Sequence, residues 1–250
     1  SGIVTDIKNL VQAELPVYIV IAGILALIVL LITMESIVTP VLFLLCIGLA
    51  ILYNMGTNIF LGQISYITQA LTAVLQLGVT MDYSIFLLES YQANKVRFDN
   101  DKERAMAHAI SNTFKSVVGS SITTVAGFAA LCFMTFALGR DLGIVMAKGV
   151  IIGVIVCITL LPSLILFFDK WIDKTTHRAI FPNFHKSSAF ITRHRVIPLL
   201  IFAILFVPAF YGNNHVKVYY NLDQGLPQDL DSAIANKKLE EKFNMNNMHI

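Results

Sequence analysis

One aspartate, Asp82, lies in the middle of a long segment that is otherwise apolar. A carboxylate near the centre of a bilayer costs about 2.5–3.5 kcal/mol on insertion scales, so it persists mainly where it has a function. A low dielectric favours the neutral form of a carboxyl group, which suits such a group to take up and release a proton. We predict that Asp82 handles protons or ions, with Tyr83 as a hydrogen-bond donor beside it. A protonated carboxyl group that serves only packing is the structural alternative.

Other polar and small residues share this segment with Asp82. On a helix of 3.6 residues per turn, Gly78 and Glu89 lie on the face of Asp82, and Gln76 and Tyr83 lie beside it. Lipid cannot satisfy such a polar arc, so we expect it to face other helices or a water-filled path. Gly78 would let a neighbouring backbone approach closely.

The next two apolar segments offer further polar groups. Ser120, Thr123 and Thr124 lie at about the depth of Asp82 and could hydrogen-bond its carboxyl group or hold a chain of waters. The alternative is that these small residues only allow close helix packing. Lys148 lies about two turns from the predicted outer end of its segment, where its side chain could reach the interface or support the ion path. Its depth should differ from that of Asp82 by about 14 Å, at 1.5 Å per residue, so we do not expect a direct pair.

The elements that must hold these residues are membrane helices. The chain of 250 residues is 56% hydrophobic and only 14% charged, which leaves too few charges to cover a water-facing surface. Spanning a bilayer takes about 20 mostly apolar residues. We therefore predict an all-α polytopic membrane protein. Six segments approach the required length: about 16–33, 37–53, 67–91, 117–138, 142–168 and 196–212.

The first apolar segment does not resemble a cleaved signal peptide. The polar stretch Thr5–Lys8 precedes it, with no basic n-region, and no small-residue cleavage pattern follows it. The chain also lacks an initiator Met and stops within a polar run. We therefore expect an excerpt of a longer polypeptide.

The distribution of Lys and Arg predicts the orientation, because short cytoplasmic loops are enriched in them. The loops at 92–116 and 171–195 are basic, whereas the loop at 54–66 has no charge and the tight link at 139–141 has one charge of each sign. The spans then alternate from an outside N-terminus. Both ends of the chain are predicted to lie outside the cytoplasm.

These assignments divide the chain into consecutive parts. Near 100–116 we expect an amphipathic helix on the inner membrane surface, with a plain connecting helix as the alternative. After the last span, a strand at 216–220, a turn and a polar helix indicate an αβ domain. The parts are the end of an extracytoplasmic domain or linker at 1–15, a five-span bundle at 16–170, a basic cytoplasmic loop at 171–195, a sixth span at 196–212 and the start of an extracytoplasmic αβ domain at 213–250.

Several function classes are not expected from this composition. The net charge is only +2 and the basic residues cluster in the inner loops, so we predict no nucleic-acid binding. The three cysteines lie within spans, where they behave as small apolar residues, and no metal-ligand pattern is present. The chain has no Walker motif, Ser-His-Asp set or zinc-ligand set, so we expect neither an enzyme nor a metal or other cofactor.

The run Gly78–Tyr83, GVTMDY, resembles the GxxxDY motif of the mycobacterial-membrane-protein-large (MMPL) branch of the resistance-nodulation-division (RND) superfamily of exporters. Val118–Phe128 and Gly143–Val150, with Thr159–Ser163, resemble the fifth and sixth helices of that family. The resemblance implies an RND-type helical bundle. Family members have twelve spans in two repeats, with a porter domain after the first span of each. This chain would hold spans two to seven, a half-repeat plus one span, and the start of the second porter domain.

The resemblance also implies a function. In the family, Asp-Tyr pairs in spans four and ten form a proton relay, so Asp82 and Tyr83 carry over as the span-four pair. The family often has a basic residue shortly after the pair, whereas this chain reads Glu89-Ser90-Tyr91-Gln92. The choice of coupling ion, proton or sodium, therefore stays open.

The implied activity is export of a hydrophobic or lipid-like substrate across the bacterial plasma membrane, driven by the proton-motive force. The implied partners are membrane lipids, the substrate and the second half of the same polypeptide, with a homo-oligomer as a further option. A sterol-sensing-type module, which binds lipid to regulate partners, is the first alternative, and an accessory subunit for protein export is the second.

Overall fold

The computed structural model describes residues 2–177, 190–215, 234 and 238. Its contacts divide the chain into two units, Lys8–Ile180 and Ser1–Ile7 with Phe181–Ile250. Six of the described helices are long and apolar enough to cross a membrane, as predicted. The chain is thus a multi-pass helical membrane protein. The predicted strand, turn and helix of the αβ domain fall almost wholly outside the described residues.

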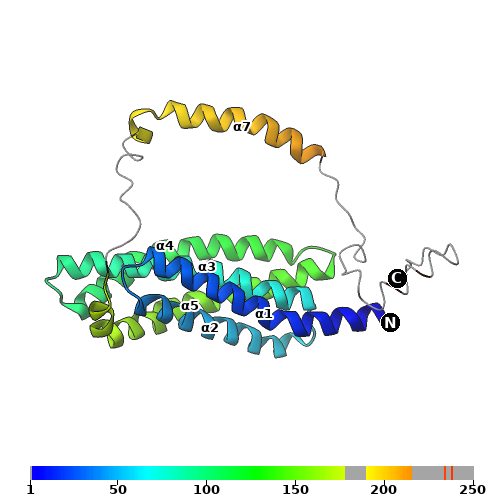
Figure 1. Ribbon diagram of the computed structural model, residues 1–250, viewed down its shortest axis with the longest axis horizontal. Coiled ribbons are helices and arrows are strands. Elements are labelled where there is room, and N and C mark those ends of the chain that lie inside the picture. The colour runs from blue at the N-terminus through cyan, green and yellow to red at the C-terminus, as the bar shows by residue number, and fades with distance from the viewer. Residues whose placement is uncertain (1, 178–189, 216–233, 235–237, 239–250) are drawn as a thin grey trace. The chain divides into compact units, whose positions relative to one another are not determined.

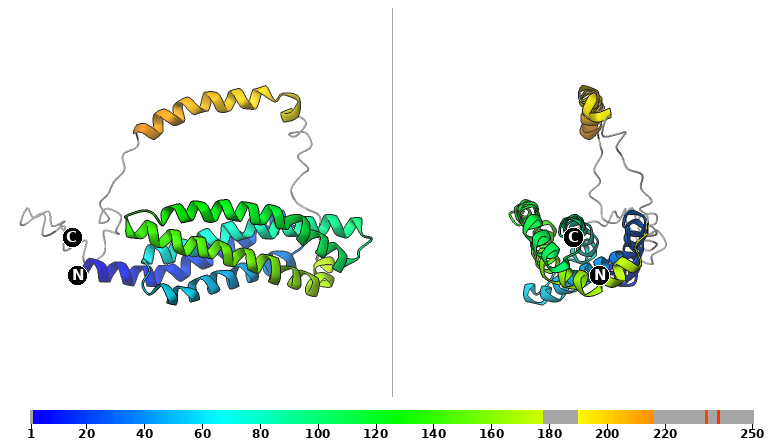
Figure 2. Two further views of the ribbon diagram at one scale, coloured as in Figure 1. Left: turned by 180° about the vertical axis from the view of Figure 1, so that it is seen from behind. Right: turned by 90° about the vertical axis from the view of Figure 1, so that its left-hand side faces the viewer.

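The first unit is a bundle of long helices that lie side by side (Figures 1 and 2). α5 contacts each of α2, α3 and α4, and α4 also packs along α3. α3 and α5 therefore form the centre of the bundle. The elements are α1 (Gly2–Thr33), of which the part from Lys8 onward belongs to this unit, α2 (Val38–Gly56), the 3₁₀ helix η1 (Thr57–Leu61), α3 (Tyr66–Arg97), α4 (Lys102–Leu131) and α5 (Ala137–Lys174).

The core of the bundle consists of apolar side chains at helical spacing. Phe43, Ile47 and Ala50 of α2 are fully buried, as are Val150 and Leu161 of α5. Lipid is as apolar as these side chains, so van der Waals packing between the helices stabilises this arrangement.

Polar caps fix the ends of α3 and α4. The Ser65 hydroxyl accepts a hydrogen bond from the Ile67 amide at 3.3 Å. The Asp101 carboxylate accepts one from the Arg104 amide at 3.1 Å. Such caps satisfy amide groups that have no partner in the first turn of a helix. Between α3 and α4, Asp99 has a φ of 51° and closes a tight turn.

The 100–116 segment differs from the predicted surface helix. It forms the first half of α4, which continues without a break to Leu131. The prediction rested on an apolar stripe at helical spacing, Met106, Ile110, Phe114 and Val117. Met106 and Val117 are buried in the core of the bundle and Ile110 packs against it, whereas Phe114 is exposed. Most of the stripe therefore serves packing between helices, and Phe114 does not take part in it.

The link between the fourth and fifth spans also differs from the prediction. It lies at 132–136, whereas residues 139–141 belong to the first turns of α5. A Cβ atom at Gly143 would lie 2.6 Å from the Phe128 carbonyl oxygen, and one at Gly139 would lie 2.7 Å from the Met134 sulfur. Gly139, which suggested a turn, thus allows close approach of α5 to the preceding link, and Gly143 allows close approach of α5 to α4.

The second unit contains α7 (Val196–His215), an apolar helix whose described side chains are nearly all exposed. Its length and composition suit a membrane span, as predicted for 196–212.

Candidate intramembrane ion site

Asp82 lies on an open face of α3, midway along the helix. Its side chain is exposed, and within the described residues it makes no hydrogen bond or ion pair. Glu89, two turns further on, is exposed as well, and a Cβ atom at Gly78 would meet nothing within 4 Å. We call the surface formed by Gly78, Asp82 and Glu89 the carboxylate face. It is a polar stripe on the outside of the bundle.

Tyr83 points away from the carboxylate face, into the bundle. Successive residues of an α-helix are about 100° apart, so neighbours such as Asp82 and Tyr83 lie on different sides. The Tyr83 side chain is only 4% exposed and belongs to the apolar core. Asp82 thus faces the open surface of α3, and Tyr83 faces the interior of the bundle.

The predicted hydroxyl groups of α4 bond to their own helix. Ser120 donates to the Val117 carbonyl at 3.1 Å. Thr123 and Thr124 donate to the Ser120 carbonyl at 2.7 and 2.9 Å. Thr123 is exposed and Thr124 is half-buried. No hydrogen bond connects these three hydroxyl groups to Asp82 in the part of the chain that the structure describes.

Gln76 is buried at the meeting point of α2, α3 and α5. Its side-chain oxygen accepts a hydrogen bond from the Asn54 amide at 2.8 Å. Its side-chain amide donates to the Gly149 carbonyl at 3.1 Å. Asn54 also donates to the Val145 carbonyl at 3.2 Å. The structure thus gives Gln76 a bridging position away from the carboxylate face.

Gly149 allows this bridge to form. A Cβ atom there would lie 2.5 Å from the Asn54 side-chain nitrogen and 3.0 Å from the Gln76 side-chain oxygen. Any larger residue would push α5 away from the two amides, so the small side chain permits the close helix contact.

Lys148 points toward the end of α2. Its ammonium donates to the Asn54 carbonyl at 3.0 Å and to the side-chain oxygen of Asn58. The side chain is half-buried, and both of these acceptors are neutral. Lys148 therefore joins α5 to α2 and η1.

We predict that replacing Gln76 with Leu destabilises the bundle by about 1–3 kcal/mol, because the buried side-chain amide of Asn54 would lose one of its two acceptors. Thermal unfolding of the purified protein in detergent would measure this. Gln69→Leu is the matched control, since Gln69 lies on the same helix and is exposed. Equal midpoints for the two variants would contradict the bridging role of Gln76.

A second polar site, which sequence reasoning missed, lies where α3 and α5 end and α4 begins. Asp169 of α5 is only 1% exposed. Its carboxylate accepts a hydrogen bond from the Tyr91 hydroxyl at 2.7 Å and pairs with Lys95 at 3.1 Å. Lys102 at the start of α4 forms an ion pair with its second oxygen. Lys95 also pairs with Asp173 at 2.7 Å.

These five residues form the charged cluster of the bundle: Tyr91, Lys95, Lys102, Asp169 and Asp173. Tyr91 and Lys95 are four residues apart, as are Asp169 and Asp173, so spacing alone places each pair on one helix face. The sequence carries no signal that the two faces meet. The fifth predicted span also ended at residue 168, just before Asp169.

The chain is similar to several known membrane proteins. It matches the MMPL family over residues 1–196. The siderophore exporter MmpL5 of Mycobacterium tuberculosis is 25% identical over 262 aligned residues, which cover all of this chain and 26% of that protein. The mycolic acid-containing lipids exporter MmpL11 of Mycolicibacterium smegmatis is 22% identical, over 68% of this chain and 19% of that protein.

A third relative is the putative membrane protein ActII-3 of Streptomyces coelicolor, which is 31% identical over 51% of this chain and 18% of its own length. The chain thus spans about a fifth to a quarter of the length of these relatives. The match covers α1 to α5, including both polar sites described above. This chain belongs to the MMPL family of membrane transporters.

Proposed function

We propose that the full-length protein exports a hydrophobic or lipid-like substrate across the bacterial plasma membrane, and that inward proton movement through Asp82 and Tyr83 drives it. The observation that carries this proposal is the exposed carboxyl group of Asp82, midway along a membrane helix. An unpaired carboxylate in contact with lipid is costly, so the carboxylate face must be covered in the working protein.

The length of the relatives supports such a cover. They are several times longer than this chain, and a corresponding further part of the full-length protein would pack on the carboxylate face. A partner group at that contact would stabilise one protonation state of Asp82, and a change of helix position would favour the other. Each proton carried inward gains about 2.3 kcal/mol per 100 mV of membrane potential.

The orientation is part of the proposal. The end of the bundle with the charged cluster also carries Arg97 and Arg104, whereas the opposite connection from α2 to α3 has no charge. By the positive-inside rule, the charged cluster faces the cytoplasm. α3 then runs inward, and both ends of this chain lie on the outer side.

The proposed substrate class rests on the names of the relatives. One is named as an exporter of mycolic acid-containing lipids and another as a siderophore exporter. Both names describe an exporter, and the first supports an amphipathic, lipid-like cargo for the present protein.

Reconstituted transport tests the proposal. The full-length protein would be placed in vesicles that contain a fluorescent lipid-like probe, with either a pH gradient or a sodium gradient imposed. We expect probe movement under the pH gradient and its loss when a protonophore collapses that gradient. Probe movement under the sodium gradient alone would show that sodium, and not the proton, is the coupling ion. Probe binding without any gradient-driven movement would contradict the transport proposal and support a lipid-sensing module.

A further inference from the structure

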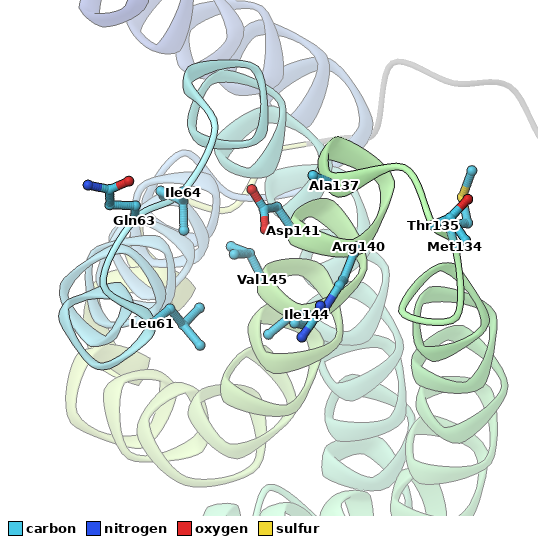
Figure 3. A pocket seen from close by; sticks show the side chains of 10 residues that line it. All are labelled: Leu61, Gln63, Ile64, Met134, Thr135, Ala137, Arg140, Asp141, Ile144 and Val145. Carbon is cyan, nitrogen blue, oxygen red and sulfur yellow. The ribbon is translucent and has the colours of Figure 1, made fainter.

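A cavity of about 410 Å³ lies at the end of the bundle opposite the charged cluster (Figure 3). Its walls come from the connection between α2 and α3, the connection between α4 and α5, and the first turns of α5. Leu61, Ile64 and Ile144 form an apolar part of its surface, beside a polar part of similar extent. Arg140 and Asp141 bring charge to the same cavity.

Asp141 has a hydrogen-bond partner in the bundle, whereas Arg140 has no ion-pair partner among the described residues. The Asp141 carboxylate accepts a hydrogen bond from the Ser65 amide at 3.3 Å, at the N-terminal end of α3. The positive end of the α3 dipole favours a carboxylate there. The negative charge of Asp141 is therefore engaged in holding α3 to α5.

Arg140 is not engaged in this way. Its side chain is exposed, extends beside Ile144 into the cavity, and forms no ion pair among the residues that the structure describes (Figure 3). It also lies in the first turns of α5, where the positive end of the helix dipole disfavours a cation. The cap residue of α5, Phe136, offers no side-chain acceptor to the first amides. Arg140 therefore has no anionic partner among the described residues, and the uncapped amide groups at the start of α5 add positive partial charge beside it.

We propose that this cavity binds the anionic headgroup of an amphiphile, a phosphate or a carboxylate, with Arg140 as its charged partner. A guanidinium presents paired donors that match either group. The apolar walls at Leu61, Ile64 and Ile144 hold the first part of the tail. The occupant comes from the membrane, because both the cavity and its apolar walls lie at the end of membrane-spanning helices.

Binding to the full-length protein in a nonionic detergent tests this proposal. Dodecyl phosphate is the probe, inorganic phosphate tests the headgroup without a tail, and dodecyl maltoside tests the tail without a charge. We expect Arg140→Gln to weaken dodecyl phosphate binding at least tenfold, and Arg140→Lys to weaken it less. Ile144→Trp, which fills the cavity and keeps Arg140, should also weaken it. Arg97→Gln is the matched control, because Arg97 is an exposed arginine at the opposite end of the bundle.

The outcomes separate the sources of the ligand. Equal binding by wild type and Arg140→Gln would overturn the site. Inorganic phosphate that competes as well as dodecyl phosphate would show a free-anion site and overturn the amphiphile. Asp82→Asn should bind the probe like wild type, since this site stands on the geometry at the start of α5 and not on ion coupling. The proposed site and the proposed proton relay can therefore fail independently.

Discussion

Asp82→Asn in the full-length protein is expected to abolish gradient-driven transport while leaving membrane expression normal. The amide is similar in size to the carboxyl group but cannot take up and release a proton. Loss of one coupled proton at 100 mV removes about 2.3 kcal/mol of driving force, which corresponds to about a 50-fold lower accumulation ratio. Uptake of a fluorescent substrate into energised vesicles measures this ratio directly.

Asp99→Asn is the matched control for this prediction. Asp99 is an exposed carboxylate in the turn between α3 and α4, and Asn tolerates its positive φ of 51° equally well. Asp82→Glu keeps a titratable group and should retain part of the transport. Normal transport by Asp82→Asn would remove Asp82 from the ion path, and an equal loss in Asp99→Asn would point to a general effect of surface charge.

Asp169→Ala is expected to cost about 3–5 kcal/mol of stability, the largest loss among the structural residues described above. The substitution leaves the Lys95 and Lys102 ammonium groups without the carboxylate that joins them, and breaking a buried pair in this way is strongly destabilising. It also removes the acceptor of the Tyr91 hydroxyl. Thermal unfolding in detergent should show a midpoint roughly 10 °C lower.

Asp173→Ala provides the comparison, because the Asp173 side chain is 54% exposed and pairs with Lys95 at the surface. An exposed pair contributes at most about 1 kcal/mol. The double variant Asp169→Ala with Lys102→Met should recover part of the loss, since it removes one uncompensated charge. Equal midpoints for Asp169→Ala and Asp173→Ala would show that burial of Asp169 has no energetic consequence.

The position of the charged cluster bears on the proposed mechanism. Tyr91 and Asp82 lie on the same helix, about 14 Å apart along its axis at 1.5 Å per residue. The cluster holds the end of α3 to α4 and α5 through contacts from three helices. A movement of α3 that exposes Asp82 to the two sides in turn must either carry α4 and α5 with it or break these contacts.

The sequence by itself determined the membrane character, the number of long apolar helices and the isolated carboxyl group within one of them. Each of these depends on local composition and spacing: about 20 apolar residues span a bilayer, and one charge among them is conspicuous. Family membership was also visible locally, in the GVTMDY run and in the two following helices. The cap at Asp101 was predictable because it depends on residues a few positions apart.

Only the tertiary structure decided which faces meet. Gln76 and Tyr83 belong to the same polar arc as Asp82 in the sequence, yet both are buried while Asp82 and Glu89 are exposed. Asp169 and Lys102 are far apart in the sequence and form an ion pair. The spacing of residues along one helix fixes which side chains share a face, but not the neighbour that covers it. That choice depends on close packing between helices, as where Gly143 and Gly149 admit groups that a Cβ atom would exclude.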